Sequence, residues 1–236
     1  MSKCENILAI TLARGGSKKL SRKNIAMLEG RPLISYTIKA AQQSKNITRF
    51  IVSTDDNEIA DIAKSCGSEV LRRPSALAQD CSPIDDSILH CLNVLKLKEQ
   101  YSSDVLVVLP PTSPLRDYHH IDDAFELFRK NTSQAVISVC EPSHHPLKSF
   151  KINDNGFIKG LVNNKNLFLP RQQLPKVLVP NGAIFIIKTN TFNRYKTLLP
   201  PKTIPYIMSK LHSVDVDDID DLNYAAYLMK KQFICV

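Results

Sequence analysis

The sequence predicts an α/β fold with a mostly parallel sheet covered by helices on both faces. Through the first 140 residues, short aliphatic and β-branched runs alternate with amphipathic stretches. Parallel strands need helical crossovers between them, so this alternation favours βαβ units. The segment Asp104–Leu109 is almost wholly aliphatic and reads as a central strand. A chain of 236 residues, 43% hydrophobic, can form one large core, so we expect a single domain over 1–236.

The predicted strands are short apolar runs bounded by loop residues. In chain order they are Ile7–Leu12, Phe50–Ser53, Asp104–Leu109, Ala135–Cys140 and Ala183–Lys188.

The predicted helices begin at residues typical of helix starts. These are Pro32, then Asp55 or Asp56, then Ser82-Pro83, and finally Asp217 or Asp218. Apolar residues follow at helical spacing, namely Ile34, Ile38 and Ala41; Ile59, Ala63 and Cys66; Ile88, Cys91 and Leu95; Ile121, Phe125 and Phe128; and Leu222, Ala226 and Met229.

The region 141–180 breaks this rhythm. It is polar, contains five prolines, and has an Asn-Asp-Asn-Gly turn at 153–156 between Phe150–Ile152 and Phe157–Leu161. Such a turn between two apolar runs indicates a hairpin. We therefore expect an insertion that projects from the sheet as a dimerisation arm.

Composition narrows the functional classes. The longest uncharged stretch, Val105–Leu115, has 11 residues and is too short for a membrane helix, and the N-terminus does not resemble a signal peptide. The six cysteines form no CxxC pair, which is typical of thiols kept reduced, so we expect a cytoplasmic protein without a membrane partner. The net charge of +8 predicts an anionic partner.

The loop after the first strand is the first candidate site. It reads Ala13-Arg14-Gly15-Gly16-Ser17-Lys18-Lys19 and continues to Arg22-Lys23-Asn24, with five basic residues between positions 14 and 23. Ligands of open α/β sheets bind at the carboxyl ends of strands, and a Gly-Gly turn leaves backbone N–H groups free. The loop is neither a Walker motif nor GxGxxG. A solvated surface turn is the alternative, but the position after a buried strand favours phosphate binding.

The second candidate is Asp215-Val216-Asp217, part of a run of five aspartates within 215–221. In an extended segment Asp215 and Asp217 point to the same side. Two carboxylates together with phosphate oxygens suit Mg²⁺. A helix cap is an equally good interpretation of the motif alone, and the neighbouring phosphate loop favours the metal.

The irregular region offers weaker candidates. His144-His145 lacks a third ligand, and most residues of this kind are solvated. Lys148 and Arg171 could bind a carboxylate, Arg171 in a bidentate manner. No serine or cysteine nucleophile system is evident.

Taken together, these motifs resemble the CMP-sialic acid synthetase family, the cytidylyltransferases that activate nonulosonic acids. The resemblance covers almost the whole chain through LARGGSK (12–18), IVSTDD (51–56), RRPSALAQD (72–80), PPTSPLR (110–116), HHPLK (144–148), PRQQLP (170–175), PNGAIF (180–185) and SVDVDD (213–218). It implies a three-layer Rossmann-like nucleotide-diphospho-sugar transferase fold, a homodimer and Mg²⁺. The implied reaction joins CTP to a nine-carbon 2-keto sugar acid, N-acylneuraminate or legionaminate, and releases pyrophosphate.

The resemblance also implies roles for residues. Arg14, Lys23, Asp217 and Arg171 would be catalytic, and Asp215 and Asp217 would hold magnesium. The nucleotide would be bound by Leu12, Ala13, Arg14, Gly15, Lys23, Asn24, Arg73 and Ser82. The sugar acid would be bound by Lys148, Arg171, Gln172 and Asn181, with part of the arm coming from a second subunit.

Two positions depart from the family pattern, and other functions remain open. Pro110 stands where family members often have Gln, and Ile84 replaces a serine. A cytidylyltransferase for another keto sugar acid, pseudaminate or KDO, is the closest alternative. A non-catalytic nucleic-acid-binding protein is disfavoured, because the chain has no Trp and its basic loop contains no aromatic residue for stacking.

Overall fold

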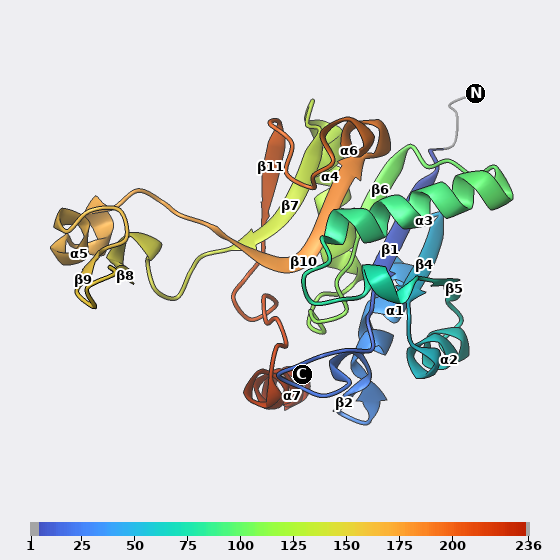
Figure 1. Cartoon of the computed structure of the whole chain (residues 1–236), viewed down its shortest axis with the longest axis horizontal. Helices are drawn as coiled ribbons and strands as arrows, with labels where there is room; N and C mark the ends of the chain where they lie inside the picture. Colours follow the sequence, from blue (N-terminus) through green and yellow to red (C-terminus); the bar gives the residue numbers. More distant parts are fainter. Residues whose placement is uncertain (1–4, 235–236) are drawn as a thin grey trace.

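A seven-stranded sheet forms the centre of the molecule in the computed structural model, which describes residues 5–234 (Figure 1). Its strand order is β11-β7-β10-β6-β1-β4-β5. The strands are β1 (Ile7–Leu12), β4 (Arg49–Thr54), β5 (Glu69–Arg72), β6 (Val105–Val108), β7 (Ala135–Cys140), β10 (Val179–Lys188) and β11 (Thr203–Ile207).

All strand pairs of this sheet are parallel except those that β10 makes with β6 and β7. This confirms the mostly parallel α/β sheet. The exception follows from chain direction, since β10 returns from the inserted arm at the edge where β7 entered it (Figure 1).

Helices cover both faces and make three layers. They are α1 (Leu33–Gln43), α2 (Asn57–Ser65), α3 (Ile84–Glu99), α4 (Tyr118–Lys130), α5 (Lys165–Phe168), α6 (Thr189–Tyr195) and α7 (Ile219–Ile234). One face packs against α1, α2 and α4 through Ile38, Ile59 and Phe125. The other face packs against α3 and α6 through Ile88 and Phe192.

Local signals in the sequence account for where these helices begin. Asp56 caps α2 by accepting a hydrogen bond from the backbone N–H of Ile59 at 2.9 Å. Asp117 caps α4 in the same way, with His120 as its partner. The predicted helix at Pro32 begins one residue later, at Leu33, and the last helix begins at Ile219, directly after Asp218, one of the two residues predicted to start it.

Residues 141–178 form an arm beside the sheet. The predicted hairpin is present as β8 (Phe150–Ile152) paired antiparallel with β9 (Ile158–Gly160). With α5 it lies away from the main body, joined to it by the ends of β7 and β10 (Figure 1). The chain also has a short ladder of β2 (Met27–Leu28) and β3 (Arg31–Pro32), against which α7 packs.

Two further observations concern the described residues. No helix within 5–234 is long and apolar enough to cross a lipid bilayer. Cys66, Cys81, Cys91 and Cys140 carry free thiols, and Cys4 and Cys235 lie outside the described residues.

Candidate active site

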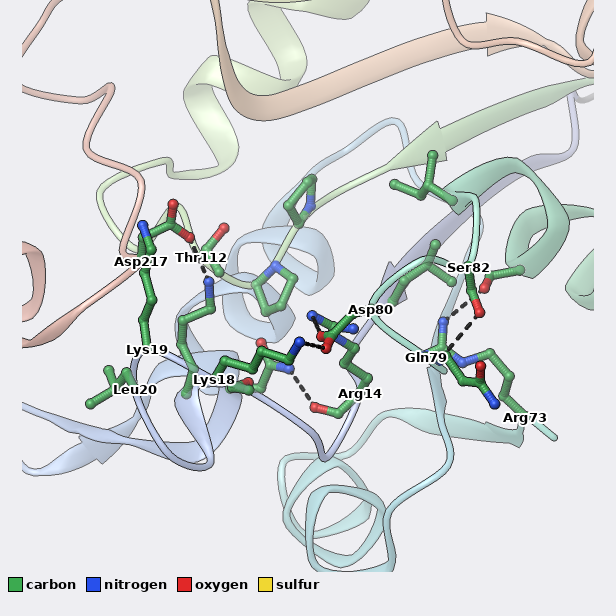
Figure 2. A pocket seen from close by; sticks show the side chains of 18 of the residues that line it. Arg14, Lys18, Lys19, Leu20, Arg73, Gln79, Asp80, Ser82, Thr112 and Asp217 are labelled. Atoms are coloured by element: carbon green, nitrogen blue, oxygen red, sulfur yellow. Dashed lines mark hydrogen bonds and ion pairs between the residues drawn. The ribbon is translucent and has the colours of Figure 1, made fainter. Parts of the chain in front are cut away.

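A hollow of about 450 Å³ opens beyond the carboxyl end of β1, where open α/β sheets bind their ligands (Figure 2). Four segments of the chain meet there. The lining residues are Leu12, Arg14, Ser17, Lys18, Lys19, Leu20, Lys23 and Asn24 from the end of β1 and the loop after it; Arg73, Leu77, Gln79, Asp80, Ser82, Ile84 and Ser87 from the segment after β5 and the start of α3; Pro110, Pro111 and Thr112 after β6; and Asp217 before α7.

The loop after β1 is held open by its own hydrogen bonds. Gly15 donates its backbone N–H to Asp55 at 3.1 Å, and the Asn24 side chain donates to the carbonyl of Arg14 at 2.9 Å. A Cβ on Gly15 would lie 2.6 Å from an oxygen of Asp56, so only glycine fits this close approach. Gly15 therefore shapes the loop without itself lining the hollow.

Four of the five basic residues of this loop line the hollow: Arg14, Lys18, Lys19 and Lys23. The fifth, Arg22, turns away and pairs with Asp56 at 2.8 Å and Glu58 at 2.7 Å. Ala13 is fully buried and donates its backbone N–H to Ser53 at 3.0 Å, so it anchors the loop to β4.

The lining is strongly positive. With Arg73 it carries five cationic side chains against the carboxylates of Asp80 and Asp217, a formal balance of 5 − 2 = +3. Asp80 accepts from Arg14 at 2.8 Å and from Lys18 at 2.6 Å, and Asp217 accepts from Lys23 at 2.7 Å. Such a surface concentrates a polyanion.

Arg73 stands at the opposite end of the hollow from Asp217 (Figure 2). Only 7% of it is exposed, and burial lowers the pKa of its guanidinium. Nη1 donates to Ser87 at 3.0 Å, whereas Nε and Nη2 have no hydrogen-bond partner. Buried donors without partners are costly, and among the described residues none supplies an acceptor for these two nitrogens of a side chain that lines the hollow.

Ser82 closes the segment between β5 and α3. Its hydroxyl donates to the carbonyl of Ala76 at 3.0 Å and accepts from the backbone of Gln79 at 3.2 Å. The hydroxyl thus fixes a tight loop that forms one wall of the hollow.

The two aspartates predicted to bind metal alternate with buried valines, as the sequence predicted. Val214 and Val216 are buried, and Asp215 and Asp217 are open to solvent. The cap of α7 is made by other residues, because Asp218 accepts from the backbones of Asp220 and Asp221, and Asp221 accepts from those of Asp217 and Asp218. The carboxylates of Asp215 and Asp217 are therefore not needed as helix caps.

These carboxylates differ in their surroundings. The surrounding protein partly desolvates the Asp215 carboxyl group and so raises its pKa. A hydrogen bond with Thr112 opposes this shift, and the negative charge of Asp217 adds to it. Lys23 lowers the pKa of Asp217. A Cβ on Gly182 would lie 3.3 Å from Asp215, and its φ of +66° favours glycine.

The oxygen donors of Asp215 and Asp217 fit a hard divalent cation. Within residues 5–234 no group of three His, Cys, Asp or Glu side chains could hold a metal by itself. The remaining ligands would have to come from water and a bound anion.

Besides Ala13, Gly15 and Asp215, four further predicted site residues lie outside the hollow. Lys148, Arg171 and Gln172 are exposed on the arm, where Arg171 donates to the carbonyl of Pro142 at 3.3 Å. Asn181 is buried at the start of β10, accepts from Ser138 at 2.6 Å and donates to Ser213 at 2.9 Å. Its binding to a sugar stays a prediction and would require these bonds to be exchanged.

Several residues of the lining were not predicted from the sequence, among them Thr112, Gln79, Asp80 and Ser87. Gln79 and Asp80 belong to the RRPSALAQD segment, so position within a motif was the available signal.

A second hollow of about 510 Å³ adjoins the first, and Ile84 lines both. It is apolar. Its other lining residues include Ile137, Val139, Leu178, Phe185, Leu198 and Leu199.

Comparison with known proteins places these features among relatives. Residues 8–176 match the family described as Cytidylyltransferase. N-acylneuraminate cytidylyltransferase of Escherichia coli O18:K1:H7 is 34% identical over 232 residues, which is 96% of this chain and 52% of that protein. The chain thus spans about half the length of that relative.

Two other similar proteins match over their full length. CMP-N,N'-diacetyllegionaminic acid synthase of Legionella pneumophila is 32% identical, covering 95% of this chain and 96% of the relative. The solved structure of CMP:2-keto-3-deoxy-manno-octonic acid synthetase complexed with CTP matches with a TM-score of 0.71 at 14% identity, over 97% of this chain and 100% of the other. That likeness confirms the fold.

Proposed function

Because the chain belongs to the cytidylyltransferase family, we propose that it transfers CMP from CTP to a nonulosonic, sialic-type sugar acid and releases pyrophosphate. The observation that carries this proposal is the positive hollow at the end of β1, which is lined by four cationic side chains of the loop after β1 and, at the end away from Asp217, by the buried Arg73 (Figure 2).

The nucleotide would lie along this hollow. Arg14, Lys18 and Lys23 would bind the triphosphate, and the free donors of Arg73 would meet acceptor atoms of the nucleoside. Asn24 and Gly15 would keep the loop in its open shape. Ser82 would hold the wall beside the base.

Cytidylyltransferases of this kind generally use a divalent metal, and we propose Mg²⁺ with Asp215 and Asp217 as its protein ligands. When bound, the ion would neutralise charge on the phosphates. Lys23 already pairs with Asp217, so it is placed to bind a phosphate oxygen once the carboxylate turns to the metal.

In the proposed reaction the anomeric hydroxyl at C2 of the sugar acid attacks the α-phosphorus of CTP in line and gives up its proton to solvent water. The bond from that phosphorus to the bridging oxygen breaks, and the pair of electrons leaves with pyrophosphate. The chain's own contribution is to position the two anions and to neutralise their repulsion through Arg14, Lys18 and Lys23.

The apolar hollow beyond Ile84 favours a sugar acid that carries apolar substituents. Nonulosonic acids bear N-acyl groups, whereas the eight-carbon acid KDO bears only hydroxyls. We therefore propose that an N-acylated nine-carbon acid is the acceptor, with its acyl group beside Ile84 and Phe185.

We also propose that the enzyme is a homodimer whose arm completes the site of the second copy. The arm exposes large apolar side chains that a soluble monomer rarely presents together, namely Phe150, Ile152, Phe157, Ile158, Val162 and Phe168. Lys148, Arg171 and Gln172 lie on this arm and would reach the sugar carboxylate across the interface.

A pyrophosphate-release screen tests the proposal. CTP, UTP, ATP and GTP are each combined with N-acetylneuraminate, legionaminate, pseudaminate and KDO, and reactions without a sugar acid are the controls. We expect release with CTP and an N-acylated acid, with kcat/KM for UTP lower by at least about tenfold, which is the value of one lost hydrogen bond. Comparable kcat/KM for CTP and UTP, or preference for KDO, would contradict the assignment.

A further inference from the structure

Asp80 lies in the segment between β5 and α3 and lines the hollow at the end of β1. One carboxylate oxygen lies 2.8 Å from Nη2 of Arg14, and the other lies 2.6 Å from Nζ of Lys18 (Figure 2). The two oxygens of one carboxylate thus engage two separate cations of the basic loop.

These contacts are the only polar contacts of the Asp80 side chain among the described residues. Asp80 caps no helix and bonds to no backbone group, whereas the hollow's other carboxylate, Asp217, pairs with Lys23 beside the proposed metal site. A structural purpose for Asp80 is therefore not apparent, and its chemistry has to be sought in the hollow.

A carboxylate that bridges an arginine and a lysine presents negative charge and two acceptor oxygens to the same donors that a bound phosphate would use. Arg14 and Lys18 are two of the cations that would hold the triphosphate. The side chains of Arg14, Lys18 and Asp80 are 35%, 81% and 41% exposed, so water can replace either pair at small cost.

We propose that Asp80 is an internal competitor for the phosphate position: it holds Arg14 and Lys18 in the empty enzyme, gives way to the triphosphate, and returns as pyrophosphate leaves. This inference rests on the proposed function, because it takes Arg14 and Lys18 to be phosphate ligands. Its consequence is weaker binding of polyphosphates and faster loss of the product.

The hydrogen bond from Lys18, with the charges of Lys18 and Arg14, lowers the pKa of the Asp80 carboxyl. The ionised form that competes for these cations is thereby favoured. Its negative charge also repels a polyphosphate after displacement, which adds to the competition.

Asp80→Asn tests the inference, because it keeps the shape and removes the charge. Binding of inorganic pyrophosphate and of CTP is measured by calorimetry without magnesium, so that metal ligation does not enter. We expect Asp80→Asn to bind both about 3- to 10-fold more tightly than the unaltered protein, as the loss of two exposed ion pairs implies. The gain should shrink at high salt, because salt screens such pairs.

Two control variants accompany it. Asp61→Asn changes the net charge equally at an exposed ion pair outside the hollow and should leave both affinities unchanged. Asp80→Glu keeps the charge and should stay close to the unaltered protein.

The possible results separate this inference from the proposed function. Unchanged or weaker binding by Asp80→Asn, while the unaltered protein binds both ligands, would overturn the competitor role and leave the enzyme assignment standing. Failure of the unaltered protein to bind either ligand would overturn both. Weakening that appears only when magnesium is added would identify Asp80 as a metal ligand and also overturn the competitor role.

Discussion

Replacing Arg73 with Met should weaken nucleotide binding and yet make the folded protein more stable. Arg73 is buried and forms no ion pair with any described residue. Two of its three guanidinium nitrogens lack partners. Met fills a similar unbranched space without placing a charge or an unpaired donor in the interior.

The size of the effect follows from these contacts. Each unpartnered buried donor costs about 1–3 kcal/mol, and the variant removes two. It also removes the bond to Ser87, whose hydroxyl keeps its own bond to the carbonyl of Leu77 at 3.1 Å. A net gain of about 1–2 kcal/mol in the free energy of unfolding corresponds to a rise in Tm of roughly 2–8 °C for a chain of this size.

CTP binding should move in the opposite direction. If the free donors of Arg73 meet acceptors of the nucleoside, losing one charged hydrogen bond costs about 1.5–3 kcal/mol, or roughly 10- to 150-fold in Kd. Calorimetry of CTP binding and thermal melts of the same samples provide both measurements.

Arg72 offers a matched control, since it is the neighbouring arginine but is exposed. Its guanidinium donates to the carbonyls of Asp56 at 2.8 Å and Asp55 at 2.9 Å. Arg72→Met should therefore not raise Tm. A lower Tm for Arg73→Met together with unchanged CTP affinity would refute the reasoning and give Arg73 a structural role.

The remaining predictions concern the metal and the arm. Asp217→Asn should change the free energy of unfolding by less than about 1 kcal/mol, because the ion pair between Asp217 and Lys23 is partly exposed. The same variant should lower magnesium-dependent turnover at least about 100-fold. Near-normal turnover of the folded variant would exclude Asp217 as a metal ligand. Arg171→Lys should lower kcat/KM for the sugar acid roughly 30- to 1,000-fold and leave the CTP affinity measured by calorimetry unchanged. Arg14→Lys should instead weaken CTP binding even when no sugar acid is present. Equal loss of CTP affinity in both variants would contradict the existence of two separate sites. Mixing Asp217→Asn chains with Arg171→Ala chains should restore up to about a quarter of normal activity, because half of the dimers are then mixed and each mixed dimer contains one intact site. Light scattering that shows an active monomer would reject the cross-subunit site.

The core of the fold could be predicted because its signal is local. Aliphatic runs such as Val105–Val108 are buried on both faces, and α2 has its cap and apolar stripe in one short stretch. The two edge strands could not be predicted in this way. Glu69–Arg72 is short and half exposed, and Thr203–Ile207 contains Pro205, which an edge position tolerates because one side of the strand needs no partner.

The site was predictable where its residues are neighbours in sequence. Arg14, Lys23 and Asn24 belong to one loop, and Asp215 and Asp217 to one extended segment. Partnerships between distant segments were not predictable, because nothing local links Asp80 to Lys18 or Thr112 to Asp215. Likewise, only the observed hydrogen bonds show which aspartates cap α7 and which do not.

The antiparallel strand β10 connects the arm to the chemistry. Its first residues lie at the carboxyl ends of the parallel strands, because it runs against β6 and β7. Gly182 there accepts from Ser113 at 3.1 Å and borders Asp215, so the base of the arm adjoins the proposed metal ligands. The tip of the arm nevertheless lies away from the main body (Figure 1), and no residue of the arm lines the hollow at the end of β1. A hinge within one chain would have to fold this segment back over its own β10, whereas in the proposed homodimer the arm of a second copy would supply these residues. Symmetric pairing is therefore the simpler way to bring Arg171 to a sugar carboxylate.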